Sequence, residues 1–234
     1  MDTFAEKIIL FLKSLDFKGS LPAGITVMNP FRGNNEVMSA VTGFYRKYYN
    51  DNKSRRMILG INPGRFGAGI TGIPFTDTVR LSEKCGIRIP GLKSFETSSV
   101  FIYDMIDAYG GPEVFYRDYF ISSVIPLGFT RSRPGGGQVN YNYYDSRELA
   151  DSVKDFAIKS IRTQIDFGID RDVCFCLGSG KNFKFLTDLN RRNKFFRLIE
   201  PLDHPRFIMQ YRSKQKNFYL DIYLEKLKRD TENR

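Results

Sequence analysis

A glycine-rich run carries the first residues in this chain whose types and spacing could do chemistry. The run "GINPGRFGAGITGIPFTD" covers residues 60–77, follows an apolar stretch, and holds Asn62 near its start and Phe75 near its end. Glycine lets a backbone approach a ligand closely, and the amides of such a loop can hold a phosphate. An aromatic ring can instead stack on a flat group. The run therefore predicts either a phosphate loop or a pocket for a planar group.

The common phosphate-binding patterns do not fit the chain. In "GSGKN" at 178–182, Phe175 stands where the Walker pattern needs its first glycine, and Asn182 stands where it needs Ser or Thr. The opening run contains Gly67-Ala68-Gly69 but no GxGxxG, and we expect no helix to begin before Pro74. These departures disfavour a nucleoside triphosphatase and a dinucleotide-binding enzyme.

The elements that must position such residues alternate along the chain. Apolar spacing predicts helices over residues 3–15 and 35–48, and "RMILGI" at 56–61 predicts a buried strand. The later segments predict, in chain order, a helix from Ser98 to Gly110, a strand in "YFISSVIPL", a loop "RSRPGGGQVNYNYYDS", a helix at about 146–166, a strand in "DVCFCLG", a helix in "KNFKFLTDLNRR", a strand in "FRLIEPLDHP" and a last helix in "KQKNFYLDIYLEKLKRD". This alternation predicts a parallel sheet covered by helices on both faces.

Polar or glycine residues follow four predicted strands. They lie in "INPGRFG", "SSVIPLGF", "CLGSGKN" and "LDHPRF". Parallel sheets place their sites beyond the carboxyl ends of the strands, so we expect these four segments to meet at one site.

The composition limits the partners and cofactors of that site. Lys and Arg number 36 against 26 Asp and Glu, and the net charge of +10 favours nucleic acid, although a basic surface also serves solubility. Three cysteines, one histidine and no CxxC pair exclude a disulfide framework and a structural zinc site, so we expect no metal and no cofactor. The N-terminal sequence does not resemble a signal peptide, and no run reaches membrane-spanning length.

The segment "GINPGRFGAGITGIPF" resembles the first active-site motif of the uracil-DNA glycosylase superfamily. It is most similar to that of the single-strand-selective monofunctional (SMUG-like) branch, which reads roughly G-M-N-P-G-P-F-G-x-x-x-T-G-V-P-F. "SSVIPLGF" and "DHPRF" resemble the H-N-x-C-P-L and H-P segments of the branch more weakly. The resemblance covers residues from about 56 to 212 and leaves the first 50 residues unplaced. The residues in register in the first motif are Asn62, Pro63, Gly64, Phe66, Gly67, Thr71, Gly72, Pro74 and Phe75.

The resemblance implies a three-layer α/β/α fold with a short, mainly parallel central sheet, and it implies a catalytic pair. Cleavage of the bond between a base and deoxyribose leaves an oxocarbenium-like sugar and an anionic base. Asn62 would orient the attacking water, and His204 would donate a hydrogen bond to the base oxygen on which charge develops. Asn62 could also simply form an Asx turn before Pro63, and a lone histidine is often structural.

A base-binding pocket is implied around the same motif. Phe75 would stack on the flipped base while the backbone at Ile61 and Gly64 approaches it, although Phe75 could also be one of many core phenylalanines. Ser123 stands where the branch has the asparagine that reads the uracil edge. A hydroxyl cannot make that paired contact, so xanthine and hypoxanthine become plausible substrates beside uracil.

Several residues are expected to contact DNA. The backbone amides of Ser179 and Gly180, with Lys181 at the start of a helix, predict a phosphate site. "PRFIMQYR" lacks the usual small and proline-rich turn of the branch, and its first apolar residues are predicted either to form a wedge that fills the vacated base stack or to pack the last helix on the sheet. The other expected contacts, including the wedge, are Arg65, Arg206, Phe207, Ile208, Arg212 and Lys214.

The whole sequence predicts one domain over residues 1–234, with a helical part before residue 50. Its expected activity is that of a monomeric, monofunctional DNA glycosylase of base excision repair, in the reducing interior of the cell and, in a prokaryote, in the cytoplasm at the nucleoid. The alternatives are a nucleic-acid-binding module without turnover and a nucleoside hydrolase. Retention of Asn62 and His204 argues against the first, and the basic excess argues against the second.

Overall fold

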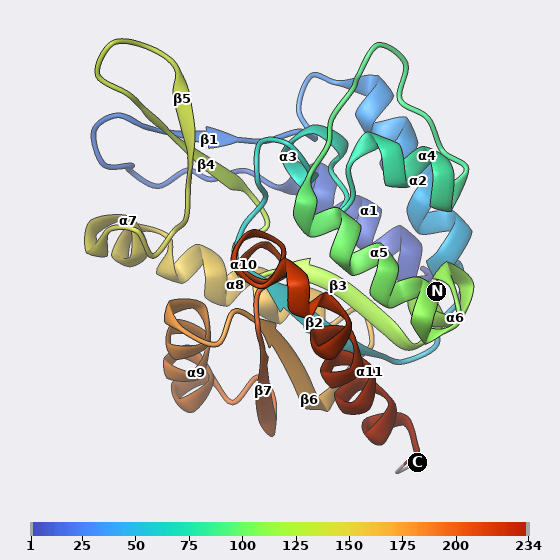
Figure 1. Ribbon diagram of the computed structural model, residues 1–234. Coiled ribbons are helices and arrows are strands. Elements are labelled where there is room, and N and C mark those ends of the chain that lie inside the picture. The colour runs from blue at the N-terminus through green and yellow to red at the C-terminus, as the bar shows by residue number, and fades with distance from the viewer. Residues whose placement is uncertain (1, 233–234) are drawn as a thin grey trace.

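The centre of the molecule is a four-stranded parallel sheet in the order β3-β2-β6-β7 (Figure 1). The computed structural model describes residues 2–232, with side chains described up to residue 228. In the sheet, Ile58 lies opposite both Ile121 and Phe175. The strands are β2 (Arg55–Gly60), β3 (Tyr119–Ser123), β6 (Ile169–Leu177) and β7 (Leu198–Leu202).

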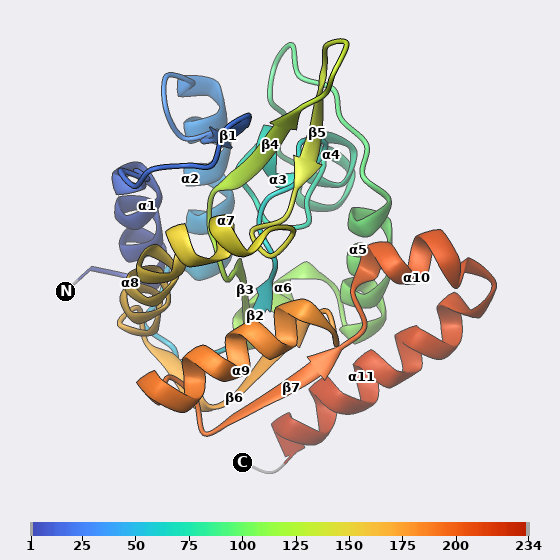
Figure 2. The same cartoon turned by 90° about the vertical axis from the view of Figure 1, so that its left-hand side faces the viewer.

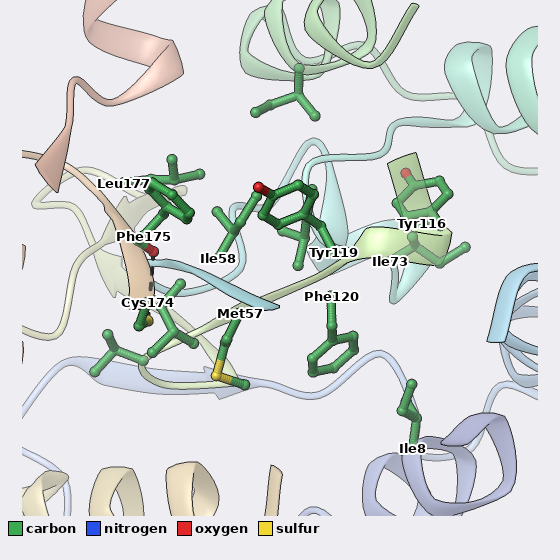
Figure 3. Close-up of a cluster of buried hydrophobic side chains, with 14 of the residues drawn as sticks. Ile8, Met57, Ile58, Ile73, Tyr116, Tyr119, Phe120, Cys174, Phe175 and Leu177 are labelled. Atoms are coloured by element: carbon green, nitrogen blue, oxygen red, sulfur yellow. Dashed lines mark hydrogen bonds between the residues drawn. The ribbon is translucent and has the colours of Figure 1, made fainter. Parts of the chain in front are cut away.

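One face of this sheet carries Met57, Phe120 and Cys174, which are neighbours in the parallel register (Figure 3). Helix α1 (Phe4–Ser14) covers it, and the Phe4 and Phe120 ring centroids are 5.5 Å apart. Helix α8 (Lys154–Ile165) covers the same face, because Ser122 of β3 donates a hydrogen bond to the Gln164 side chain. Helices therefore close this side of the core.

The opposite face carries Ile58, Tyr119 and Phe175, since successive strand side chains alternate (Figure 3). Helix α11 (Lys216–Glu232) lies against it, and the Tyr119 hydroxyl donates to the Leu227 carbonyl at 2.7 Å. Helix α5 (Thr97–Tyr109) packs beside α11. The three-layer α/β/α fold expected from the sequence is confirmed.

A second, antiparallel sheet stands to one side (Figures 1 and 2). It has the order β1-β4-β5, with β1 (Ile25–Met28), β4 (Gly128–Ser132) and β5 (Gln138–Tyr141). The expected loop 131–146 is thus partly wrong, because Arg131–Ser132 and Gln138–Tyr141 pair as a β-hairpin with a glycine-rich tip. Val139, Tyr141 and Tyr143 do alternate with polar residues, but the run is short and follows Pro134 and three glycines, which are typical of a loop.

The remaining helices connect and cover these sheets.

Two expectations from the sequence about these helices are wrong. The single helix expected at 146–166 is two helices that meet at Val153, and a one-turn helix does begin before Pro74. Within residues 2–232, no helix is long and apolar enough to cross a membrane. These helices are α2 (Asn35–Tyr49), α3 (Ala68–Thr71), α4 (Thr78–Cys85), α6 (Pro112–Asp118), α7 (Arg147–Ser152), α9 (Lys181–Asn193), α10 (Pro205–Tyr211) and the 3-10 turn η1 (Ser213–Gln215).

Candidate active site

A cavity of about 500 Å³ opens beyond the carboxyl ends of all four parallel strands. Its lining includes Asn62 after β2, Ser123 at the end of β3, Gly178 after β6 and His204 after β7. The four segments that the sequence placed after strands do meet at one site.

The Asn62 side chain is held in one orientation by the end of β5 and the residues just after it. Its Oδ1 accepts from the Tyr143 backbone N–H at 3.1 Å, and its Nδ2 donates to the Tyr141 carbonyl at 3.3 Å. These two contacts decide which end of the amide is oxygen, because a flipped amide would set donor against donor. One lone pair of Oδ1 remains for a water or a substrate hydroxyl.

His204 is held as a neutral ring that can donate into the cavity. Its Nδ1 accepts from the Arg206 backbone N–H at 3.1 Å, so in the neutral ring the proton lies on Nε2. Withdrawal of the ring from water, and then the positive charge of Arg206, lower the pKa of His204 to about 4. At neutral pH the imidazole is therefore a hydrogen-bond donor without charge.

Phe75 lines the same cavity in a strained backbone conformation. Its φ of 51° is in the left-handed region, which a bulky residue seldom occupies. The ring lies directly over Gly60, where an added Cβ would come within 2.7 Å of Phe75 Cε2. The ring centroid is 5.7 Å from that of His204, and the two ring planes are tilted by 49°. Gly60 therefore permits an aromatic wall that the cavity lining includes.

Ser123 presents a free hydroxyl at the floor of the cavity. Its neighbour Ser122 points to the other face of the sheet, where it is bonded to Gln164, whereas Ser123 lines the cavity. Among the described residues, no hydrogen bond to the Ser123 hydroxyl is present. Ile61 and Gly64 also line the cavity, as the sequence predicted.

The start of α9 borders the cavity with the three residues expected to hold a phosphate. Ser179, Gly180 and Lys181 all line it. The Ser179 hydroxyl is already bonded to Asp203 at 2.9 Å, and Lys181 Nζ is 5.9 Å from the Tyr144 ring centroid. The backbone amides of Gly180 and Lys181 begin the helix without a side-chain cap, which leaves them open to an anion.

The segment after His204 is a helix, α10, and this corrects part of the predicted wedge. Ile208 has 0% of its surface exposed and packs in the core, so its prediction as a DNA contact is wrong for this conformation. Phe207, on the other side of the helix, is 39% exposed and lines the cavity with Arg206. The sequence alone could not show which of the neighbours Phe207 and Ile208 is exposed. The helix decides this, because consecutive helical residues point in different directions.

The remaining predicted cations differ in their surroundings. Arg212 lies over the Phe207 ring, 5.8 Å from its centroid, and Lys214 is exposed in η1. Arg65 donates to the Gln138 carbonyl and lies 4.9 Å from the centroid of Phe66, so it is tied to the β-hairpin. None of these three belongs to the cavity lining.

Several lining residues were missed by sequence reasoning. Glu96, Asn140, Tyr144 and Asn182 all face the cavity. Asn140 Oδ1 accepts from the Arg65 backbone N–H at 2.9 Å and so joins the β-hairpin to the first motif. Of these, Asn182 lies in a segment that was expected at the site, whereas Glu96 has no stronger signal than its place just before a predicted helix.

The arrangement combines an oriented amide, an uncharged donor and an aromatic wall around a space open to solvent.

Comparisons with known proteins identify the family of the chain. Residues 46–228 match the family model described as the uracil DNA glycosylase superfamily. Among solved structures, the chain is similar to wild-type SMUG2 of Pedobacter heparinus, with 54% identity and a TM-score of 0.97 over 99% of this chain and 100% of that one. No curated protein matches. This chain is a DNA glycosylase and belongs to the uracil DNA glycosylase superfamily.

Proposed function

We propose that this glycosylase hydrolyses the N-glycosidic bond of uracil, xanthine or hypoxanthine in DNA, with water as the nucleophile. The observation that carries the proposal is the pair of fixed groups at one cavity: the Asn62 amide, bonded at both ends, and the neutral His204 ring, bonded at Nδ1. Both are preorganised before any substrate binds, which is how electrostatic catalysis avoids reorganisation during the reaction.

Asn62 positions the water. An amide cannot act as a general base, but the free lone pair of its Oδ1 can accept a hydrogen bond from a water and so aim the water oxygen at the anomeric carbon. The sugar carries oxocarbenium character in the transition state, so a well-placed water needs little activation. Tyr141 at the end of β5 and Tyr143 just after it hold Asn62, and the β-hairpin is thereby part of the catalytic machinery.

His204 stabilises the leaving base. Its Nε2–H donates to the base oxygen on which negative charge builds up, and loss of such a donor typically costs about 3 to 4 kcal/mol of barrier. Because the pKa of His204 is lowered to about 4, the ring donates in its neutral form at neutral pH.

Phe75 and Ser123 receive the base. The Phe75 ring offers a stacking surface, and stacking on an aromatic side chain is worth about 1 to 3 kcal/mol per base. The free Ser123 hydroxyl can donate or accept, so it suits the different edges of uracil, xanthine and hypoxanthine equally. The proposed range of bases rests on this hydroxyl.

The DNA strand enters across the start of α9 and the exposed side of α10. The open amides of Gly180 and Lys181 suit a phosphate, and Phe207 is the exposed aromatic next to the cavity that can fill the vacated stack. We propose that a monomer acts, since every group named here comes from one chain.

The test is a single-turnover panel of oligonucleotides that carry uracil, xanthine, hypoxanthine or no lesion, each single-stranded and paired. Release of at least one deaminated base and an intact strand until alkali is added are expected. Borohydride trapping is the second arm, because the lining includes one lysine, Lys181. A trapped covalent complex that Lys181→Ala abolishes would show an amine nucleophile and contradict hydrolysis by water.

A further inference from the structure

The Glu96 carboxyl stands in the cavity without a partner. Glu96 is half-buried and lines the cavity, yet within residues 2–232 no hydrogen bond or ion pair to its carboxylate is present. Its Oε1 would be 3.0 Å from a Cβ on Gly64, and its Oε2 lies close against Gly67. The two motif glycines therefore leave room for this carboxyl.

The ordinary role of an acidic residue at this position does not account for Glu96. It occupies the N-cap of α5, but its side chain makes no capping hydrogen bond and turns toward the cavity instead. Its backbone N–H is fixed by a 2.8 Å bond to the buried Asp77 carboxylate. The main chain of Glu96 is therefore fixed, the two glycines confine its side chain, and its carboxyl is left available to a ligand.

The charges around Glu96 keep its two protonation states close in free energy. Burial, followed by the negative charge of Asp77, raises the pKa of Glu96 to about 7, and Arg206 opposes that rise. Asp77 itself is paired with Arg80 at 3.1 Å. Of the other charged groups at this wall, Arg65 is bonded to Gln138, and His204 stays neutral above its pKa of about 4. Near pH 7 the carboxyl is present as both donor and acceptor.

We propose that Glu96 is a specificity-determining residue that donates a hydrogen bond from its protonated carboxyl to N7 of a purine base. The inference rests on the proposed function, in which His204 takes the base edge next to the glycosidic bond and Ser123 takes the far edge. In this proposal the third edge is placed against Gly64 and Glu96, which also line the cavity. In uracil that edge carries only C5–H and C6–H, whereas in a purine it carries C8–H and the acceptor N7.

The protonation state sets the sign of the effect. The protonated carboxyl, which dominates below pH 7, donates to N7, and the ionised carboxylate, which dominates above it, repels the N7 lone pair. The ratio of hypoxanthine release to uracil release should therefore fall by about tenfold between pH 6 and pH 8, as the protonated fraction falls by that factor. Glutamine at this position keeps an N–H donor at every pH.

The experiment measures single-turnover release of hypoxanthine and uracil from matched oligonucleotides at pH 6, 7 and 8. Hypoxanthine is the purine probe because xanthine loses a ring proton in this range. Glu96→Gln should keep the ratio seen in the parent at pH 6 and make it independent of pH, whereas Glu96→Ala should lower it about tenfold at pH 6. Glu83→Gln, on the exposed side of α4, is the matched control and should change neither.

The outcomes separate this inference from the proposed function. A parent ratio that is flat in pH overturns the inference without any variant. So do variants that slow both bases equally, since that marks a structural or water-positioning role, and so does a parent that releases uracil but no hypoxanthine. A parent that releases no base from any oligonucleotide would contradict the proposed function as well.

Discussion

The polar side chains at the two ends of strand β2 differ in how completely they are hydrogen-bonded. At its amino end, the Arg55 side chain is completely buried, and all five of its N–H donors are used. Its guanidinium carbon lies 4.9 and 4.8 Å from the ring centroids of Phe4 and Tyr49. Beyond its carboxyl end, Asn62, His204 and Glu96 are each held by hydrogen bonds, but each keeps a side-chain donor or acceptor without a partner among the described residues.

The contrast separates groups that stabilise the fold from groups that are left for a ligand. A buried charge is tolerated only when its partners are complete, because an unpaired one carries the full cost of desolvation. The cavity keeps Ser123 and Glu96 incompletely paired, and the surrounding strain at Phe75 is of the kind that clusters at functional sites. Incomplete pairing within a well-packed fold therefore points to the site.

The largest expected effect is on the fold, at the amino end of β2. Arg55→Met should lower the free energy of unfolding by about 3 to 5 kcal/mol, because the Asp51 carboxylate and the Tyr48 and Tyr116 carbonyls lose their donors. Urea denaturation measures the loss. Base release per folded molecule should stay within twofold of the parent.

Arg32→Met is the matched control, since its ion pair with Asp16 lies at the surface and its side chain is 64% exposed. It should cost no more than about 1 kcal/mol. Equal losses in the two variants would remove the basis for treating the Arg55 cluster as a stability site.

The next effect is on catalysis, at the other end of the same strand. Asn62→Ala and His204→Ala should each slow single-turnover base release by about two or more orders of magnitude, because both groups act mainly in the transition state. Oligonucleotide affinity should change by only a few fold. Asn217→Ala, an exposed position in α11, is the control and should release base at the parent rate. Near-normal release by both variants would refute the catalytic pair.

Some of the residues at the two ends of β2 could be placed from sequence patterns, and others could not. Alternating apolar segments were enough for the parallel sheet, and its carboxyl edge follows from topology, so Asn62, Ser123 and His204 could be brought together without coordinates. The β-hairpin that holds Asn62 was harder to predict, because β4 and β5 have only five and four residues and are joined by a glycine-rich tip that is typical of a loop. Asn62 is 79 residues from Tyr141 and 81 residues from Tyr143 in the chain.

Helix α10 shows a different limit. Pro205 at the first position after His204 is a typical helix start, but the short apolar run after it was also compatible with a turn. Only the helical turn shows that Ile208 faces the core and Phe207 faces outward. For Glu96, the sequence identifies a helix beginning, whereas the direction of an N-cap side chain is set by its tertiary neighbours, here Gly64 and Gly67.

A smaller effect is expected on specificity, at the end of β3. Ser123→Asn replaces a rotating hydroxyl by a planar donor and acceptor that match the adjacent N–H and carbonyl of uracil. Release of uracil relative to xanthine should rise by about tenfold to a hundredfold, the worth of one polar contact. Ser213→Asn, in the exposed η1 turn, is the control and should keep the parent ratio. The neighbouring Ser122 cannot serve, because it is buried and bonded to Gln164. An active Ser123→Asn variant with the parent ratio would place base selection elsewhere in the lining.

The smallest expected effect is on the salt dependence of DNA binding. It should distinguish surface cations that have no ion pair from cations that have one. Arg212 and Lys214 have no ion pair among the described residues, whereas Arg191 of α9 is paired with Asp188 at 2.7 Å. Binding to undamaged DNA should weaken steeply between about 50 and 200 mM salt, because condensed counterions are released on binding. Arg212→Ala and Lys214→Ala should each reduce the slope of log affinity against log salt by about one, as removal of one phosphate contact does. Arg191→Ala should leave the slope unchanged, since its charge is already compensated and lies away from the cavity. If all three variants shifted the slope equally, DNA would be responding to net charge alone, and the open cations beside α10 would form no defined binding surface.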